Sequence, residues 1–167
     1  MIYVKNYKII FYNKPTRTFK MKIPSIILIL AITMISIVHA DVAGIKGGKQ
    51  LQAEAAKHIK NISTVELKKL LADDLEVVLI DIRLPSEIKS MGGAIKAQQN
   101  INIPRGWLEW RVTNVALDKD TPIVVYCGAN IRSPLATDTL MKMGYTHVKN
   151  YTDGYIGWKK AGLPIVK

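Results

Sequence analysis

Cysteine is almost absent from this chain, which has a single one, Cys127, among its 167 residues. One cysteine excludes any disulfide bond within the chain. The thiol is therefore either a small buried apolar group or a side chain kept for its reactivity.

Histidine is also scarce, and no histidine has a second metal ligand at a suitable spacing. His39 lies in an apolar N-terminal segment, and His58 and His147 stand alone. A metal site is therefore not expected. The glycine-rich fingerprints of nucleotide-binding proteins are missing as well, so we expect no cofactor.

Acidic residues are absent from residues 1–40, which hold six of the 24 basic residues. Residues 41–167 carry the other 18 basic residues and all 13 acidic ones, a net +5 of the +11 for the whole chain. The two signs are interspersed, without the dense runs typical of binding to a phosphate backbone. We expect a mildly basic solvated surface and no nucleic-acid partner.

The N-terminal segment has the layout of a secretory signal peptide. Met21 and the lysine after it form a short positive start, an apolar run follows, and the small-residue sequence VHA ends at Ala40. We expect a leader over residues 1–40 with its start at Met21, cleavage after Ala40, and a periplasmic or secreted protein. The uncharged span 23–40 is slightly short of the ~20 residues that cross a bilayer. An anchor in the inner membrane, facing the periplasm, is the alternative, and only then would the membrane be a partner.

Strand and helix patterns alternate along the rest of the chain. Residues 41–61 are expected to be a flexible N-terminal arm, with one or two helical turns within 50–60. Strands are predicted at 77–81, 100–104, 121–126 and 147–151, and helices at 64–73, 85–91, 105–117, 134–143 and 153–162. This alternation predicts a single α/β domain over 62–167 with a central, mostly parallel sheet flanked by helices.

Local signals support individual helices. Ser63 and Glu66 have the spacing of a capping box, and Ser133 is expected to cap the helix whose first residue is Pro134. Trp107 and Trp110, three residues apart on a predicted helix, are expected in the core or at a pocket wall.

The sequence CGANIRS lies between a predicted strand and a predicted helix, the usual position of ligands in open α/β sheets. Successive backbone amides of such a loop can turn inward and, with the following helix, lower the pKa of a thiol. Arg132 adds a positive charge. The residues of this candidate site are Cys127, Gly128, Ala129, Asn130, Ile131, Arg132 and Ser133.

Besides an enzyme that forms a persulfide on the thiol, two other classes of protein fit a lone thiol in such a loop. Phosphatases and arsenate reductases place five residues between cysteine and arginine, whereas four separate Cys127 from Arg132, with Ser133 at the phosphatase position. The shorter loop favours a persulfide sulfur over a phosphoryl group. A carrier that holds a persulfide for a protein partner, with little free turnover, is the third possibility.

Four segments in order, VVLIDIRLPSEI, GAIKAQQNINIPRGWLEW, PIVVYCGANIRS and MKMGYTHVKNYTDGYIGW, resemble a single-domain rhodanese, a thiosulfate or persulfide sulfurtransferase. The resemblance covers about 62–162 and, with the leader, is greatest to periplasmic rhodaneses of the phage-shock protein E type. It implies a three-layer rhodanese-like fold.

The resemblance also implies roles for individual residues. Cys127 would be the nucleophile that accepts sulfur, the loop amides would hold the persulfide, and Arg132 would orient the loop and attract an anionic donor. Asp81 and Arg83 match an Asp-x-Arg motif and are expected to form a structural ion pair. Glu87 matches the acidic residue that follows, as solvated surface or a loop brace.

The implied reaction moves sulfur from thiosulfate, or a similar small anion, to cyanide or a thiol, in a monomer without metal or cofactor. The sequence departs from the family pattern in three places. Ala94 stands where the family usually has histidine, Ala97 and Gln98 replace a glycine, and Asp153 replaces one glycine of a pair. These departures bear on loop packing and rate.

Overall fold

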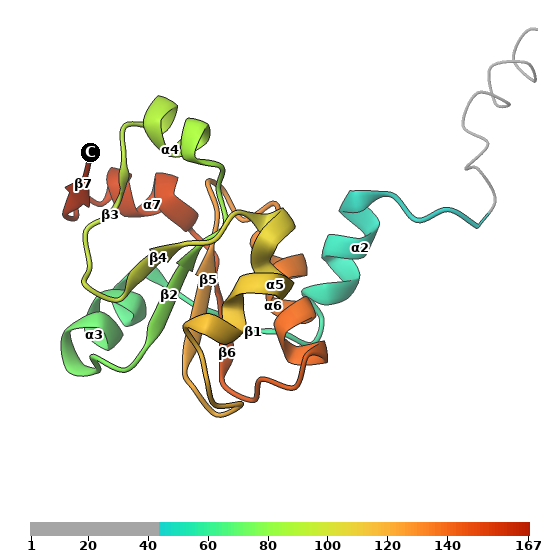
Figure 1. Ribbon diagram of the computed structural model, residues 1–167. Coiled ribbons are helices and arrows are strands. Elements are labelled where there is room, and N and C mark those ends of the chain that lie inside the picture. Colours follow the sequence, from blue (N-terminus) through green and yellow to red (C-terminus); the bar gives the residue numbers. More distant parts are fainter. Residues whose placement is uncertain (1–43) are drawn as a thin grey trace, which may run out of the picture. The chain divides into compact units, whose positions relative to one another are not determined.

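The computed structural model describes residues 44–167 (Figure 1). The predicted leader, its cleavage site and the alternative anchor fall on residues 1–40, outside the described part. Within the described part, no helix combines the length and the apolar character needed to cross a bilayer. Residues 46–167 form one compact unit.

A five-stranded sheet forms the centre of this unit. Its strands, in spatial order, are β1 (Lys60–Ile62), β6 (Val148–Tyr151), β5 (Ile123–Tyr126), β2 (Val78–Asp81) and β4 (Asn100–Asn102). Every neighbouring pair is parallel. The prediction of a parallel sheet is therefore confirmed, with each predicted strand present in shortened form.

The central strands are apolar because both faces of the sheet are covered. All four residues of β5 are buried, and they alternate between two cores. Ile123 and Val125 contribute to the first core, and Val124 and Tyr126 to the second. Each aliphatic side chain buried in this way stabilises the fold by roughly 1.5–3 kcal/mol.

Helices form the two outer layers (Figure 1). The helical segments are α2 (Gly48–Ala55), α3 (Thr64–Asp73), α4 (Pro85–Met91), η1 (Arg105–Trp107), α5 (Leu108–Arg111), η2 (Val112–Asn114), α6 (Ser133–Lys142) and α7 (Gly154–Lys160). The first core lies between the sheet and α5, η2 and α6, whereas the second lies between the sheet, α3 and α7. Three layers result, as the resemblance to rhodaneses implied.

The N-terminal boundary differs from the expectation of a flexible arm over 41–61. The helical turns expected within 50–60 occur as α2, which begins at Gly48, and β1 pairs Lys60 to Ile62 with β6. Ala55 and Ile59 are buried, at 2% and 8% exposed. These apolar side chains pack onto the domain, so the ordered fold begins before residue 62.

The segment after β4 also differs from prediction. The expected continuous helix is divided into η1, α5 and η2, and it ends at Asn114. Trp107 and Trp110 are 53% and 77% exposed, so their expected place in the core is wrong. The short helical pieces bury Leu108 and Val112 instead, which turns the tryptophans outward.

Two strands that the sequence analysis did not predict form a separate antiparallel pair, β3 (Ala94–Ile95) with β7 (Ile165–Val166). Gly93, with φ of 123°, precedes this pair and lies against the carbonyl of Val166, where a side chain would clash. At two residues each, these strands are too short to show periodicity.

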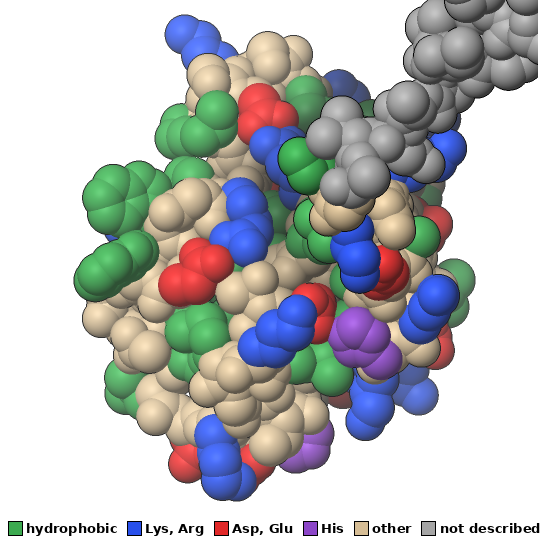
Figure 2. All heavy atoms as spheres, turned by 90° about the vertical axis from the view of Figure 1, so that its right-hand side faces the viewer, with side chains coloured by type: hydrophobic (Ala, Val, Ile, Leu, Met, Phe, Trp, Pro, Cys, Tyr) green, Lys and Arg blue, Asp and Glu red, His purple; other side chains and the backbone are tan. Residues whose placement is uncertain are grey.

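The face of the domain that carries α2 and α6 has basic and acidic side chains interspersed, as Figure 2 shows. Several of them pair, including Lys142 with Asp138 at 2.7 Å and Arg105 with Glu109 at 2.8 Å. This face matches the mildly basic solvated surface expected from the sequence.

Candidate active site

The candidate site lies where the direction of the sheet connections reverses. The chain runs outward from β2 to β4 on one side and from β5 to β6 on the other. The carboxyl ends of β2 and β5 are neighbours, since the Ile82 amide donates to the Tyr126 carbonyl at 3.0 Å. The loops that leave these two ends diverge, which is the usual origin of a binding crevice in α/β proteins.

Cys127 follows β5 directly, and its side chain continues the alternation of that strand into the first core. The residue is 1% exposed, and its Sγ lies 3.6 Å from the Ser133 Oγ. Ser133 is thus the first residue of α6 and a neighbour of the thiol. Its predicted role as the N-cap is wrong, because Arg132 occupies that position and no side chain caps the helix.

The active loop, residues 127–133, lowers the pKa of the Cys127 thiol. Burial opposes ionisation of the thiol most strongly. The backbone amides of Arg132, Ser133 and Ala129 and the Ser133 hydroxyl outweigh it and together hold the pKa of Cys127 below its ordinary value. The loop therefore stabilises a thiolate in a site nearly closed to water.

Arg132 binds Glu87 rather than pointing freely into the crevice. Its Nη1 and Nη2 donate to the two carboxylate oxygens at 2.9 and 2.6 Å. Glu87 also accepts from the Leu84 amide at 2.9 Å. The guanidinium and this amide lower the pKa of Glu87 to about 2. Of the two roles expected for Glu87, solvated surface or loop brace, the structure shows the brace, as a bidentate pair with Arg132.

Asp81 and Arg83 form a fully buried ion pair beneath the active loop, as expected. Arg83 Nε donates to Asp81 Oδ1 at 2.9 Å, and Nη2 donates to Oδ2 at 2.5 Å and to the Gly93 carbonyl at 3.0 Å. The guanidinium lies 4.1 Å from the centre of the Tyr155 ring. The pair thus ties the segment after β2 to α7.

Helix α7 supports the active loop through backbone amides of its first turn. The amides of Tyr155 and Ile156 donate to the carbonyls of Cys127 and Gly128 at 2.9 and 3.0 Å. Gly154 permits this approach, because a Cβ there would lie 2.8 Å from both carbonyl oxygens.

The structure shows the surroundings of two departures from the family pattern, and explains one of them. The Asp153 carboxylate accepts hydrogen bonds from the Thr64 hydroxyl at 2.7 Å and the Thr64 amide at 3.3 Å, so it joins the starts of α7 and α3. Ala94 lies in β3, paired with Val166.

Sequence reasoning missed two side chains that donate hydrogen bonds to Asn130 of the active loop. Gln52 Nε2 donates to the Asn130 carbonyl at 2.6 Å, and Asn150 Nδ2 donates to the Asn130 Oδ1 at 3.0 Å. Neither has a local signal, because contacts between positions 78 and 20 residues apart leave no periodicity in the sequence. Ile131, which the sequence analysis includes in the candidate site, is 65% exposed.

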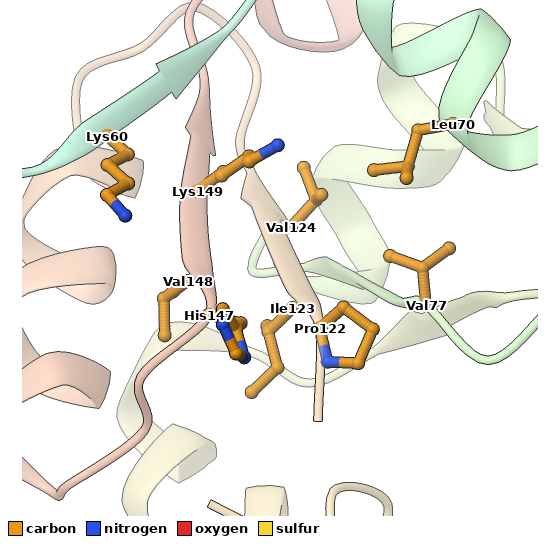
Figure 3. Close-up of a pocket in the computed structure, with 9 residues that line it drawn as sticks. All are labelled: Lys60, Leu70, Val77, Pro122, Ile123, Val124, His147, Val148 and Lys149. Carbon is orange, nitrogen blue, oxygen red and sulfur yellow. The ribbon is translucent and has the colours of Figure 1, made fainter. Parts of the chain in front are cut away.

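A cavity of about 150 Å³ lies at the opposite, amino-terminal ends of the strands. Figure 3 shows its lining side chains, among them Val77, Ile123 and Val148 at the starts of three strands. The lining is largely apolar, and it is separated from Cys127 by the length of β5. This cavity therefore takes no part in the chemistry of the active loop.

The fold and the site together define a class of protein: a three-layer α/β domain that presents one buried thiol in an amide-lined loop at the carboxyl ends of parallel strands. The chain belongs to the rhodanese-like domain family, which matches residues 63–161. The resemblance noted from its motifs is thereby confirmed.

Individual relatives of this chain include sulfurtransferases. The chain is 36% identical over 108 residues to a sulfurtransferase of Allochromatium vinosum, covering 65% of this chain and 95% of that protein. It is 35% identical over 88 residues to the thiosulfate sulfurtransferase PspE of Escherichia coli, covering 53% of this chain and 77% of that protein.

Solved structures show the same fold. The polysulfide-sulfur transferase homodimer of Wolinella succinogenes matches with a TM-score of 0.62 and 32% identity, over 71% of this chain and 85% of that one. A Rhodopseudomonas palustris protein of unknown function, described as a possible tyrosine phosphatase, matches with a TM-score of 0.65 and 28% identity, over 75% and 98%.

Proposed function

We propose that this chain is an exported sulfurtransferase, which moves a sulfur atom from thiosulfate or a similar donor to a thiophilic acceptor through a persulfide on Cys127. The observation that carries the proposal is the Cys127 thiol itself, buried among the amides of Ala129, Arg132 and Ser133, which lower its pKa. The sulfurtransferases among the relatives support it.

The first step is a displacement at sulfur. The Cys127 thiolate attacks the outer sulfur of thiosulfate, a bond forms between the two sulfur atoms, and the bond to the central sulfur of the donor breaks. Sulfite leaves with the electron pair of that bond, and Cys127 carries a persulfide anion. We expect the same amides that stabilise the thiolate to stabilise the negative charge on the new outer sulfur.

The second step returns the enzyme to its starting state. Cyanide, or a thiolate, attacks the outer sulfur of the persulfide, and the bond to Cys127 breaks with its electron pair returning to Sγ. Thiocyanate or a new persulfide leaves. Charge and atoms balance in both steps, and the covalent intermediate divides one transfer into two displacements.

Intact mass measurement tests the proposal. The protein is incubated with thiosulfate and its mass is compared with that of Cys127→Ser treated in the same way. A gain of one sulfur atom in the wild-type chain and none in the variant is expected, followed by loss of that sulfur on addition of cyanide. A wild-type mass that stays unchanged with both thiosulfate and polysulfide contradicts the proposal.

The same measurement on protein recovered from the periplasmic fraction tests export. A mass that begins at Asp41 supports a cleaved leader, and recovery only from the membrane fraction at the mass of the uncleaved chain supports the anchored alternative. Absence from both fractions contradicts export while leaving the chemistry open to the first test.

A phosphatase is the second candidate, favoured by the similarity to the possible tyrosine phosphatase of Rhodopseudomonas palustris. The pairing of Arg132 with Glu87 argues against it, since that guanidinium is already bound to a carboxylate. Hydrolysis of p-nitrophenyl phosphate without persulfide formation would decide for the phosphatase. Persulfide formation without transfer to cyanide would decide for a carrier.

A further inference from the structure

Asn130 gives the active loop its sharp turn. Its φ of 57° is the one positive value outside glycine among residues 44–167. Asparagine tolerates this conformation better than most residues, but surrounding contacts must hold it. The Ala129 amide precedes this turn and the Arg132 and Ser133 amides follow it, and all three help to lower the pKa of Cys127. The turn at Asn130 therefore sets the relative placement of the amides that act on the thiol.

Two side chains from outside the loop hold Asn130. Gln52 of α2 donates to its carbonyl at 2.6 Å, and Asn150 of β6 donates to its side-chain oxygen at 3.0 Å. Asn150 is 1% exposed, and its amide nitrogen also donates to the Asn61 side chain at 2.8 Å. Asn130 is thus fixed at its backbone by one element and at its side chain by another.

Helix α2 is itself held on the domain. It packs beside α6 (Figure 1), and Ala55 at its end is buried. Just after the helix, His58 contacts Asp138 of α6 at 2.8 Å. A cavity of about 250 Å³ lined by both Gln52 and Asn130 leaves part of the space between α2 and the active loop without apolar packing. The hydrogen bond from Gln52 Nε2 to the Asn130 carbonyl joins the helix to the loop directly.

We propose that Gln52 is a positioning residue for Cys127, through which α2 fixes the turn at Asn130 and thereby the amides that surround the sulfur. The inference rests on the proposed role of Cys127 as the reacting thiol. Helix α2 lies outside residues 63–161, which match the family. The brace is thus supplied by a segment of this chain that precedes the family domain.

A loosened loop has a measurable effect on the thiol. Burial raises the pKa of Cys127, and the loop amides lower it by more. When the amides lose their alignment while the thiol stays buried, the pKa rises toward and beyond its ordinary value. The charged groups beside the loop, Arg132 and its partner Glu87, are unchanged by a substitution at Gln52.

The test compares Gln52→Met with Gln50→Met in the full chain. Methionine keeps the length of the side chain and removes the donor. Gln50 is an exposed residue of the same helix, so its variant is a matched control. The rate of Cys127 alkylation by iodoacetamide is measured across pH. For Gln52→Met we expect the midpoint to rise by about half a pH unit and the rate near pH 7 to fall about threefold, with Gln50→Met like wild type.

An alkylation profile of Gln52→Met that coincides with wild type overturns the inference, as does an equal shift in both variants. Thermal unfolding is followed in parallel, and Gln52→Ala replaces the methionine variant if the latter does not fold. Alkylation needs no sulfur donor. A wild-type chain that takes up no sulfur therefore counts against the proposed function, whereas the pH profile alone decides the role of Gln52.

Discussion

Arg132 shows how a single residue can serve two partners. Its guanidinium holds Glu87 through two hydrogen bonds, yet it also lies close enough to Cys127 for their charges to interact. Because Glu87 neutralises the arginine, the net charge beside Cys127 depends on both side chains. In the proposed reaction we therefore expect the pair to adjust the affinity for an anionic donor, in addition to bracing the active loop.

If thiosulfate is the donor as proposed, charge variants of this pair are expected to have opposite effects on its half-saturation concentration. Arg132→Met leaves Glu87 uncompensated, so the thiosulfate concentration for half-saturation should rise, by about threefold to tenfold at low ionic strength. Glu87→Gln should lower it, and the double variant should return toward wild type. Steady-state kinetics with cyanide as acceptor measure all three. An unchanged half-saturation in Arg132→Met would show that the loop amides suffice.

The sequence predicts the place of the candidate nucleophile more fully than its partners. The position of Cys127, directly after a buried strand and before a helix, follows from local patterns. The pairing of Arg132 with Glu87, 45 residues apart, does not, because each alone resembles an ordinary surface charge. The prediction of Ser133 as the N-cap fails for a related reason. The N-cap and the first helical residue differ by one position, and only the folded structure distinguishes them.

At the scale of elements, the close approach of α7 to the active loop depends on one glycine. Gly154 begins the helix with φ of 58°, and its Cα faces the carbonyls of Cys127 and Gly128. The next two amides donate to those carbonyls. A side chain at Gly154 would separate helix and loop and break both hydrogen bonds.

Gly154→Ala is therefore expected to lower the free energy of unfolding by roughly 1–3 kcal/mol and to slow the alkylation of Cys127. Gly162→Ala is the matched control, since Gly162 has a similar φ of 67° with open space around its Cα. That control should lose about 1 kcal/mol and keep wild-type reactivity. Urea unfolding and iodoacetamide kinetics measure the two effects, and equal reactivity in both variants would contradict the role given to α7.

Elements with a clear local signal were predictable, and those that depend on a distant partner were not. The capping box of Ser63 and Glu66 is present at the start of α3, and β5 lies within its predicted range. Strands β1, β3 and β7 have two or three residues each. They exist because a distant partner supplies the hydrogen bonds, which local sequence does not reveal. The exposed Trp107 and Trp110 show the same limit, since helical spacing indicates a shared face but not its direction.

For the whole molecule, the thiol couples stability to pH. The folded state lowers the pKa of Cys127, so between the folded and unfolded pKa values the unfolded chain binds more protons. The free energy of unfolding therefore gains a contribution that is absent below the folded pKa and complete above the unfolded value, about 8.5. Glu87, with its pKa lowered from 4.5 to about 2, contributes its own change only within that acidic range.

Urea unfolding of wild type and Cys127→Ser from about pH 6 to pH 9 isolates this contribution. The difference in unfolding free energy, wild type minus variant, should increase with pH by about 1.4 kcal/mol for each unit by which the fold lowers the thiol pKa. Other titrating groups are common to both chains and cancel. A difference that is flat or decreases with pH would contradict a stabilised thiolate.

The edge of the sheet has a consequence for the order in which the molecule is assembled. Strand β1 pairs with β6, so Asn61 meets Asn150, 89 residues later in the chain. Contacts across so long a loop form late in folding, because the entropy of closure must be overcome first. The brace from Gln52 spans nearly the same separation. We therefore expect a chain that is still folding to carry an ordinary, unactivated thiol until the segments around residues 52–61 and 130–150 have come together.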